Sequence, residues 1–172
     1  MITSSQKLLM ARAGVVPPAP PTDPDFSSVS LLLHGDGTDG STTFTDSSSN
    51  NFTVTANGNA QIDTAVKKYG TGSMEFDGTG DSLTIADNAA FAFGTGDFTV
   101  EAWVNFNDIS GSQQIVSSYS LGFSVQYEGA WKIYLAGGTN VMTRSFTPNT
   151  DQWYHHWHTV RSSLLVLYSS IP

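Results

Sequence analysis

Cysteine is absent from this chain of 172 residues, and charged side chains make up only 13% of it. Without cysteine there is no disulfide bond, no zinc–thiolate site and no thiol nucleophile. Basic residues are especially scarce: seven Lys and Arg stand against fifteen Asp and Glu, which gives a net charge of −8. Proteins bind nucleic acids and anionic membranes through clustered Lys and Arg, so we expect neither as a partner.

Long apolar runs are also missing. No run in the sequence approaches the roughly 20 residues that a membrane-spanning helix needs. The N-terminal region ends in Ala11-Arg12-Ala13, which is faintly similar to a signal-peptide cleavage site, but Arg12 interrupts the apolar run before it. We therefore expect neither membrane insertion nor secretion by a cleaved leader.

Gly, Ser, Thr, Asn and Asp take the place of the missing charges, and aromatic residues make up 12% of the chain. An aromatic content of this size is incompatible with intrinsic disorder. A chain of this length buries roughly 68–70% of its unfolded surface, so a substantial core is expected. The composition indicates one folded domain, with or without a tail.

Two short segments precede the expected domain. Residues 4–13 are rich in helix formers and are followed by Gly14, which predicts a short helix that needs a packing partner. Residues 15–24 hold most of the prolines and predict an extended spacer. We expect residues 1–25 to form an anchoring arm and residues 26–172 to form the domain. The arm's predicted anchoring contacts are Lys7, Leu8, Leu9, Met10 and Arg12.

From residue 26 onward the pattern predicts an all-β fold. Short apolar or alternating runs recur between clusters of turn-forming residues, and no helix of three turns fits. Residues 98–106 alternate with a period of two, which places Phe98, Val100, Ala102, Val104 and Phe106 on one face. Many short strands with regular turns indicate a sandwich or a barrel. The predicted strands are 29–33, 52–55, 73–77, 82–85, 98–106, 114–118, 123–127, 131–135, 141–146, 153–160 and 164–168.

Four ordered blocks of sequence resemble a known family. The first comprises residues 31–37 (LLLHGDG) and 44–51 (FTDSSSNN), and the second residues 68–85 (KYGTGSMEFDGTGDSLTI). Residues 91–104 (FAFGTGDFTVEAWV) and 153–162 (WYHHWHTVRS) form the third and fourth. Together they resemble laminin G-like, concanavalin A-like jelly rolls of the kind common in bacteriophage and environmental virion proteins. The resemblance implies an antiparallel two-sheet jelly-roll sandwich, but it specifies no activity because one fold hosts many functions.

Two features depart from the family pattern. Where the family has small apolar residues between its His and Arg, this chain has His156, Trp157 and His158. Family members also continue for several strands beyond this block, whereas this chain ends at Pro172. We therefore expect the C-terminal strands of the jelly roll to be truncated, leaving an open sheet edge unless another subunit supplies them. The alternative is a natural or sequencing variation of the C-terminus.

Five aspartates suggest a cation site. Asp36, Asp39 and Asp46 lie in a loop rich in Gly, Ser and Thr, and Asp77 and Asp81 belong to a second turn. Clustered carboxylate and carbonyl oxygens suit Ca²⁺, and the resemblance is compatible with such a site, because related lectin folds often carry this ion near a rim. We favour the other interpretation, turn formation, since Asp and Asn are preferred where they bond their own backbone.

His155, His156 and His158 invite a transition-metal interpretation, because positions 156 and 158 share one face of a strand. Such a site needs a third or fourth ligand, and His34 is the only other imidazole in the chain. We favour a structural role for these histidines.

Exposed aromatic rings are the usual platform for sugars, whose C–H faces stack on them. For any single ring burial is the more common outcome. Trp103 and Trp153 lie in motif strands and are predicted to be core residues. Rings that lie beside turns or interrupt the alternation are the candidates for ligand binding, namely Tyr119, Tyr127, Trp131, Tyr134 and Trp157.

Catalysis finds little support. Glycosidases need two carboxylates at a defined separation, whereas Glu75, Glu101 and Glu128 stand far apart in the sequence. No nucleophile elbow and no phosphate-binding loop is present. We therefore expect no enzymatic activity.

The combined expectation is a structural protein of a phage virion: a tail fibre, a head fibre or a capsid decoration. Its arm would bind other virion proteins, further copies of the chain would complete an oligomer, and the domain would face outward toward host-surface glycans. The alternative is a free carbohydrate-binding module of the lectin type, with or without calcium.

Overall fold

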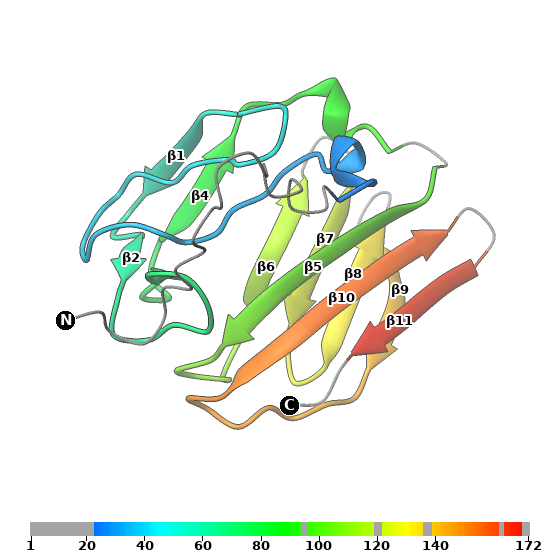
Figure 1. The fold of residues 1–172 in the computed structure, drawn as a ribbon. Coiled ribbons are helices and arrows are strands. Elements are labelled where there is room, and N and C mark those ends of the chain that lie inside the picture. Colours follow the sequence, from blue (N-terminus) through cyan, green and yellow to red (C-terminus); the bar gives the residue numbers. More distant parts are fainter. Residues whose placement is uncertain (1–22, 94–95, 119–121, 136–138, 162–163, 170–172) are drawn as a thin grey trace, which may run out of the picture.

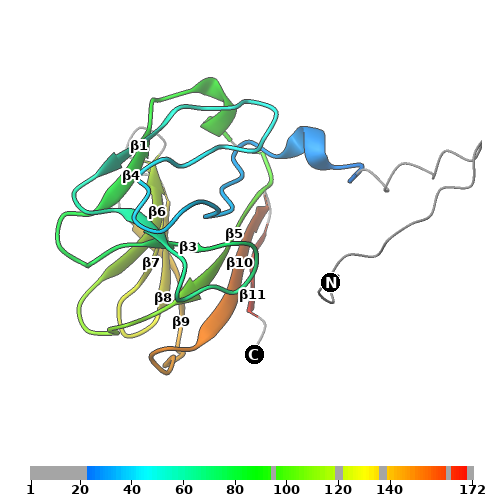
Figure 2. The same ribbon diagram turned by 60° about the vertical axis from the view of Figure 1, so that its left-hand side comes forward.

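Two antiparallel β-sheets pack face to face (Figure 1). The computed structural model describes residues 23–93, 96–118, 122–135, 139–161 and 164–169. One sheet has the strand order β6-β7-β8-β9 and the other has the order β11-β10-β5. Figure 2 shows the same two sheets after a turn of 60°. Two smaller ladders, β1-β4 and β2-β3, complete the fold. The strands are β1 (Val54–Asn57), β2 (Gln61–Asp63), β3 (Ser73–Glu75), β4 (Ser82–Ile85), β5 (Phe98–Asn105), β6 (Gln113–Ser118), β7 (Phe123–Tyr127), β8 (Trp131–Leu135), β9 (Thr139–Arg144), β10 (Trp153–Arg161) and β11 (Leu164–Ser169).

The predicted all-β antiparallel sandwich is confirmed. The only helical elements among the described residues are two single turns, η1 (Phe26–Ser28) and η2 (Ala89–Phe91). The second turn begins where the Asn88 side chain accepts a hydrogen bond from the backbone N–H of Ala90. In the part of the chain that the structure describes, no helix is long and apolar enough to cross a membrane.

Most predicted strands lie where the sequence placed them, and β4, β7 and β8 match residue for residue. Two differences stand out. Residues 29–33 form no strand, since only Leu33 pairs, through a single bridge to Asp46. Conversely, β2 was not predicted, because a run of three residues with one apolar side chain, Ile62, gives almost no periodic signal.

The core lies between the two main sheets and follows the alternation of their strands. On β7 every second side chain is buried, and β8 contributes Trp131 and Ile133 in the same way. A large apolar side chain that is fully buried contributes roughly 1.5–3 kcal/mol, so this cluster supplies much of the folding free energy. Its buried members are Phe106, Val125, Tyr127, Trp131 and Ile133, with Val100, Val104, Ile109, Ile115, Val116, Leu135 and Phe146 packed around them.

Candidate functional site

Four aromatic side chains form a row across the outer face of the β5–β10 pair; we call Tyr69, Trp103, His155 and Trp157 the aromatic row. Ring centroids of Tyr69 and Trp103 lie 5.5 Å apart in an edge arrangement, and those of Trp103 and His155 lie 4.8 Å apart and stack at 15°. His155 and Trp157 follow at 5.2 Å. The row is therefore continuous from the β2–β3 connection to the middle of β10.

The row lies outside the sandwich because of strand alternation. Val100 and Val104 of β5 pack against the core, so the alternate positions, Glu101 and Trp103, point away from it. On β10 the buried residues are Tyr154, His156 and His158, which leaves the odd-numbered positions on the outer face. The antiparallel register sets His155 opposite Trp103, and neighbouring strands lie about 4.8 Å apart, so the two rings stack.

Trp103 was predicted to be a core residue, and that prediction is wrong. Its side chain is 37% exposed, and Tyr69 is 65% exposed. The signal was present in the sequence, because the alternation that places Phe98, Val100, Ala102 and Val104 on one face places Trp103 on the other. Trp153, predicted to be core as well, is half-buried.

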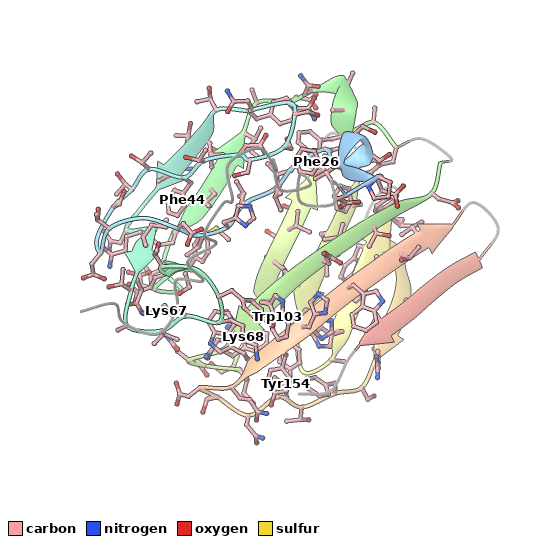
Figure 3. All side chains as sticks on the ribbon, in the orientation of Figure 1. Phe26, Phe44, Lys67, Lys68, Trp103 and Tyr154 are labelled. Carbon is pink, nitrogen blue, oxygen red and sulfur yellow. The ribbon has the colours of Figure 1, made fainter. Side chains whose placement is uncertain are left out.

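Lys68 lies beside the row, with its Nζ 4.5 Å from the Trp103 ring centroid and 6.0 Å from that of Tyr69 (Figure 3). Both Lys68 and Tyr69 belong to the connection between β2 and β3. A cation at this distance is attracted to the electron-rich face of a Trp ring, so the lysine and the ring hold each other in place.

Two aspartates fasten this connection to the body of the domain. Asp39 accepts hydrogen bonds from the Thr64 backbone N–H at 3.0 Å and from its hydroxyl at 3.1 Å. At the other end, Asp36 accepts from the Thr71 backbone N–H at 2.6 Å and from its hydroxyl at 3.0 Å. The backbone N–H of Thr71 is the main reason that the pKa of Asp36 lies below its usual value. These contacts fix where Lys68 and Tyr69 lie.

The structure does not assemble the five aspartates into one cation site. Asp46 is buried in the loop before β1, while Asp77 and Asp81 lie on the turn between β3 and β4. Asp77 accepts from the Thr79 N–H at 2.7 Å, and Asp81 accepts from the Asp77 N–H at 2.7 Å. Among the described residues, no group of three or more His, Cys, Asp or Glu could hold a metal ion. The carboxylates of the five aspartates accept hydrogen bonds from backbone N–H groups instead, as turn-forming aspartates do.

Of the five aromatic residues predicted to bind a ligand, the four that the structure describes are split among three locations. Tyr127 and Trp131 are each 1% exposed and belong to the core, so their prediction as a sugar platform is corrected. Proximity to the turn between β7 and β8 suggested exposure, but both rings lie on the inward face of their strands. Tyr134 is half-buried, out of phase with the buried positions of β8. Trp157 alone lies on the aromatic row, and Tyr119 lies outside the described residues.

His156 and His158 share a strand face, as predicted, and that face is buried: each is 4% exposed. In the described residues, the Nδ1 of His156 and both ring nitrogens of His158 have no hydrogen-bond partner. Burial, with a smaller contribution from neighbouring charges, lowers the pKa of His156 to about 3 and that of His158 to about 4. Both imidazoles are therefore neutral at pH 7.

The three glutamates lie on separate elements. Glu75 on β3 accepts a hydrogen bond from Gln61, and Glu128 beyond β7 forms an ion pair of 2.9 Å with Lys132. Glu101 is exposed on β5, opposite Trp157 in the register of β10.

The predicted anchoring residues, Lys7 to Arg12, lie outside the described residues.

A comparison with protein-family models matches residues 77–169 to the concanavalin A-like lectin/glucanases superfamily. This span runs from the turn before β4 through β11, so it contains both main sheets and three members of the aromatic row. No curated protein and no solved structure matches the chain.

Proposed function

Because the chain belongs to the concanavalin A-like lectin/glucanase superfamily, we propose that it is a carbohydrate-binding domain without catalytic activity. Proteins of this superfamily often bind carbohydrates. The observation that carries the proposal is the aromatic row, a line of four rings on the outer face of a sheet, of which Tyr69 and Trp103 are exposed and His155 and Trp157 are half-buried. Exposed aromatic surface of this kind marks a binding site in soluble proteins, and each ring joins an apolar face to a polar edge.

The absence of catalysis is inferred from the carboxylates of this face. Hydrolysis of a glycosidic bond uses a pair of carboxyl groups about 5–10 Å apart. Among the side chains that the structure describes, the outer positions of β5 and β10 carry one carboxylate, that of Glu101. A saccharide on the row would meet a binding surface with no second carboxylate from these two strands.

A glycan array probed with the full chain tests the proposal. We expect binding to at least one class of glycan, and we expect Tyr69→Ala to weaken it at least fivefold, since this ring is the most exposed of the row. The matched control is Tyr134→Ala on the four-stranded sheet, which removes a half-buried tyrosine away from the row. Unchanged melting temperatures show that both variants are folded. A blank array, or equal losses in the two variants, would overturn the proposal.

The virion role expected from the sequence is a second proposal. It is supported by the resemblance to virion domains and by the Pro-rich segment before the domain. Residues 1–22, which include most of that segment, lie outside the described residues. Deleting residues 1–25 and measuring incorporation into particles tests this role, since an anchored protein would then be lost from them.

A further inference from the structure

Positive charge is rare in this chain, and where it lies is informative. The net charge is −8, and the only two basic residues adjacent in the sequence are Lys67 and Lys68. Both are exposed on the β2–β3 connection. By contrast, Lys132 forms an ion pair of 2.9 Å with Glu128, and Arg144 is half-buried on β9. Among the basic side chains that the structure describes, Lys68 is the one in contact with the aromatic row.

The ammonium group of Lys68 is held but not neutralised. It lies 4.5 Å from the Trp103 ring centroid, and no carboxylate of the described residues is within ion-pair distance of it. Lys67 donates to the backbone carbonyl of Thr64 at 2.8 Å, which leaves two of its three donors for a ligand. Because Asp36 and Asp39 fasten the connection, neither lysine has to be ordered from a free loop when a ligand arrives.

We propose that the ligand of the aromatic row is an acidic saccharide whose carboxylate pairs with Lys68 while its sugar rings lie against Trp103 and Tyr69. This inference rests on the proposed carbohydrate-binding function and names the class of ligand. A carboxylate accepts charge-assisted hydrogen bonds from an ammonium group, which are about twice as strong as neutral ones. A neutral sugar would leave this interaction unused.

The surrounding charges further restrict the ligand. Glu101 lies opposite Trp157, so the far end of the row is negative. A densely sulfated polymer would place several anions against Glu101 and against the net charge of −8. The pattern therefore favours a saccharide with isolated carboxylates, such as uronic acids separated by neutral sugars.

The test uses two tetrasaccharides that differ only in their carboxylates. One is a hyaluronan tetrasaccharide, in which uronic acid alternates with a neutral sugar, and the other is its carboxyl-reduced form. Titrated into the full chain at low salt, the acidic form should bind about three- to fivefold more tightly, since an exposed ion pair is worth up to about 1 kcal/mol. Raising the salt concentration to 0.5 M should abolish the preference.

Variants separate the lysine from the rest of the face. Lys68→Gln removes the charge but retains most of the stem, so this variant should bind the acidic and the reduced form with equal affinity. Lys132→Gln, on the other sheet, should leave the preference intact.

Each remaining outcome has a distinct meaning. If both forms bind equally, or if the array yields only neutral glycans, the acidic-ligand inference is overturned while the proposed function stands. If neither the array nor the tetrasaccharides show binding, both fall together.

Discussion

At the scale of single residues, the aspartates of this chain serve as backbone acceptors, and Asp46 shows this most clearly. Its side chain is 2% exposed and accepts from the backbone N–H groups of Leu32, Ser48 and Phe52 at 2.9–3.0 Å, and from the Ser48 hydroxyl at 2.8 Å. Burial raises the pKa of this carboxyl, but the hydrogen bonds from Phe52, Leu32 and Ser48 outweigh it and hold the pKa below its usual value. The sequence indicated a loop rich in Asp, but not which aspartate was buried.

Replacing Asp46 by Ala should destabilise the domain by about 2–4 kcal/mol, because it leaves several buried N–H donors without an acceptor. Asp39→Ala, which removes an exposed acceptor of one N–H and one hydroxyl, should cost about 1 kcal/mol or less. Urea unfolding of the two variants compares them directly. Equal losses would show that the buried hydrogen bonds of Asp46 carry no special weight.

At the scale of elements, β10 joins two faces of opposite character. Its odd-numbered positions carry His155 and Trp157 to the aromatic row, while its even-numbered positions place His156 and His158 in the core. Strand periodicity predicted that His156 and His158 lie on the same face of β10. Their burial was not predictable from periodicity, since it depends on the second sheet, which places Trp131 against both imidazoles.

The buried histidines should make the domain acid-sensitive well above the range where carboxylates titrate. The unfolded chain takes up protons on them below about pH 6.5, whereas the pKa values of the folded state are about 3 and about 4. Their contribution to stability is therefore complete above about pH 6.5 and is lost progressively as the pH falls toward 4. Between pH 7.5 and 5.5 we expect a loss of up to about 1.4 kcal/mol per histidine.

Urea unfolding at these two pH values measures this loss. His158→Leu should reduce the pH dependence and, by removing unpartnered buried nitrogens, should preserve or raise stability at pH 7.5. His155→Gln, on the outer face, should retain the full pH dependence. An unchanged slope in the His158 variant would contradict the argument.

The elements also show where sequence analysis succeeds. Strands with strict alternation, such as β7, and strands bounded by tight turns, such as β8, are predicted to the residue. The site was harder to predict because it is made by register and by a loop: β10 pairing sets His155 against Trp103, and the β2–β3 connection brings Tyr69 to the same ring. Neither relation has a signature within a single segment.

At the scale of the whole molecule, the sandwich separates stability from binding. The core between the sheets holds Trp131, at 1% exposure, while Trp103 lies on the opposite side of β5, at 37%. The sequence predicted the opposite roles for these two tryptophans, Trp103 in the core and Trp131 as a ligand-binding ring. The structure reverses them, because Trp131 of β8 faces the space between the two sheets and Trp103 of β5 faces away from it.

Substitution of these two residues should show the separation. Trp131→Ala should destabilise the domain by about 3–5 kcal/mol, as expected for a large buried ring, and the milder Trp131→Phe should cost less while the protein stays folded. Trp103→Ala should cost about 1 kcal/mol or less in urea unfolding, yet it should weaken glycan binding at least as much as Tyr69→Ala, because it also releases Lys68. Two results would contradict this separation. One is a loss of glycan binding in Trp131→Phe although the protein stays folded. The other is a loss of stability in Trp103→Ala as large as that in Trp131→Ala, which would mean that the outer face stabilises the fold.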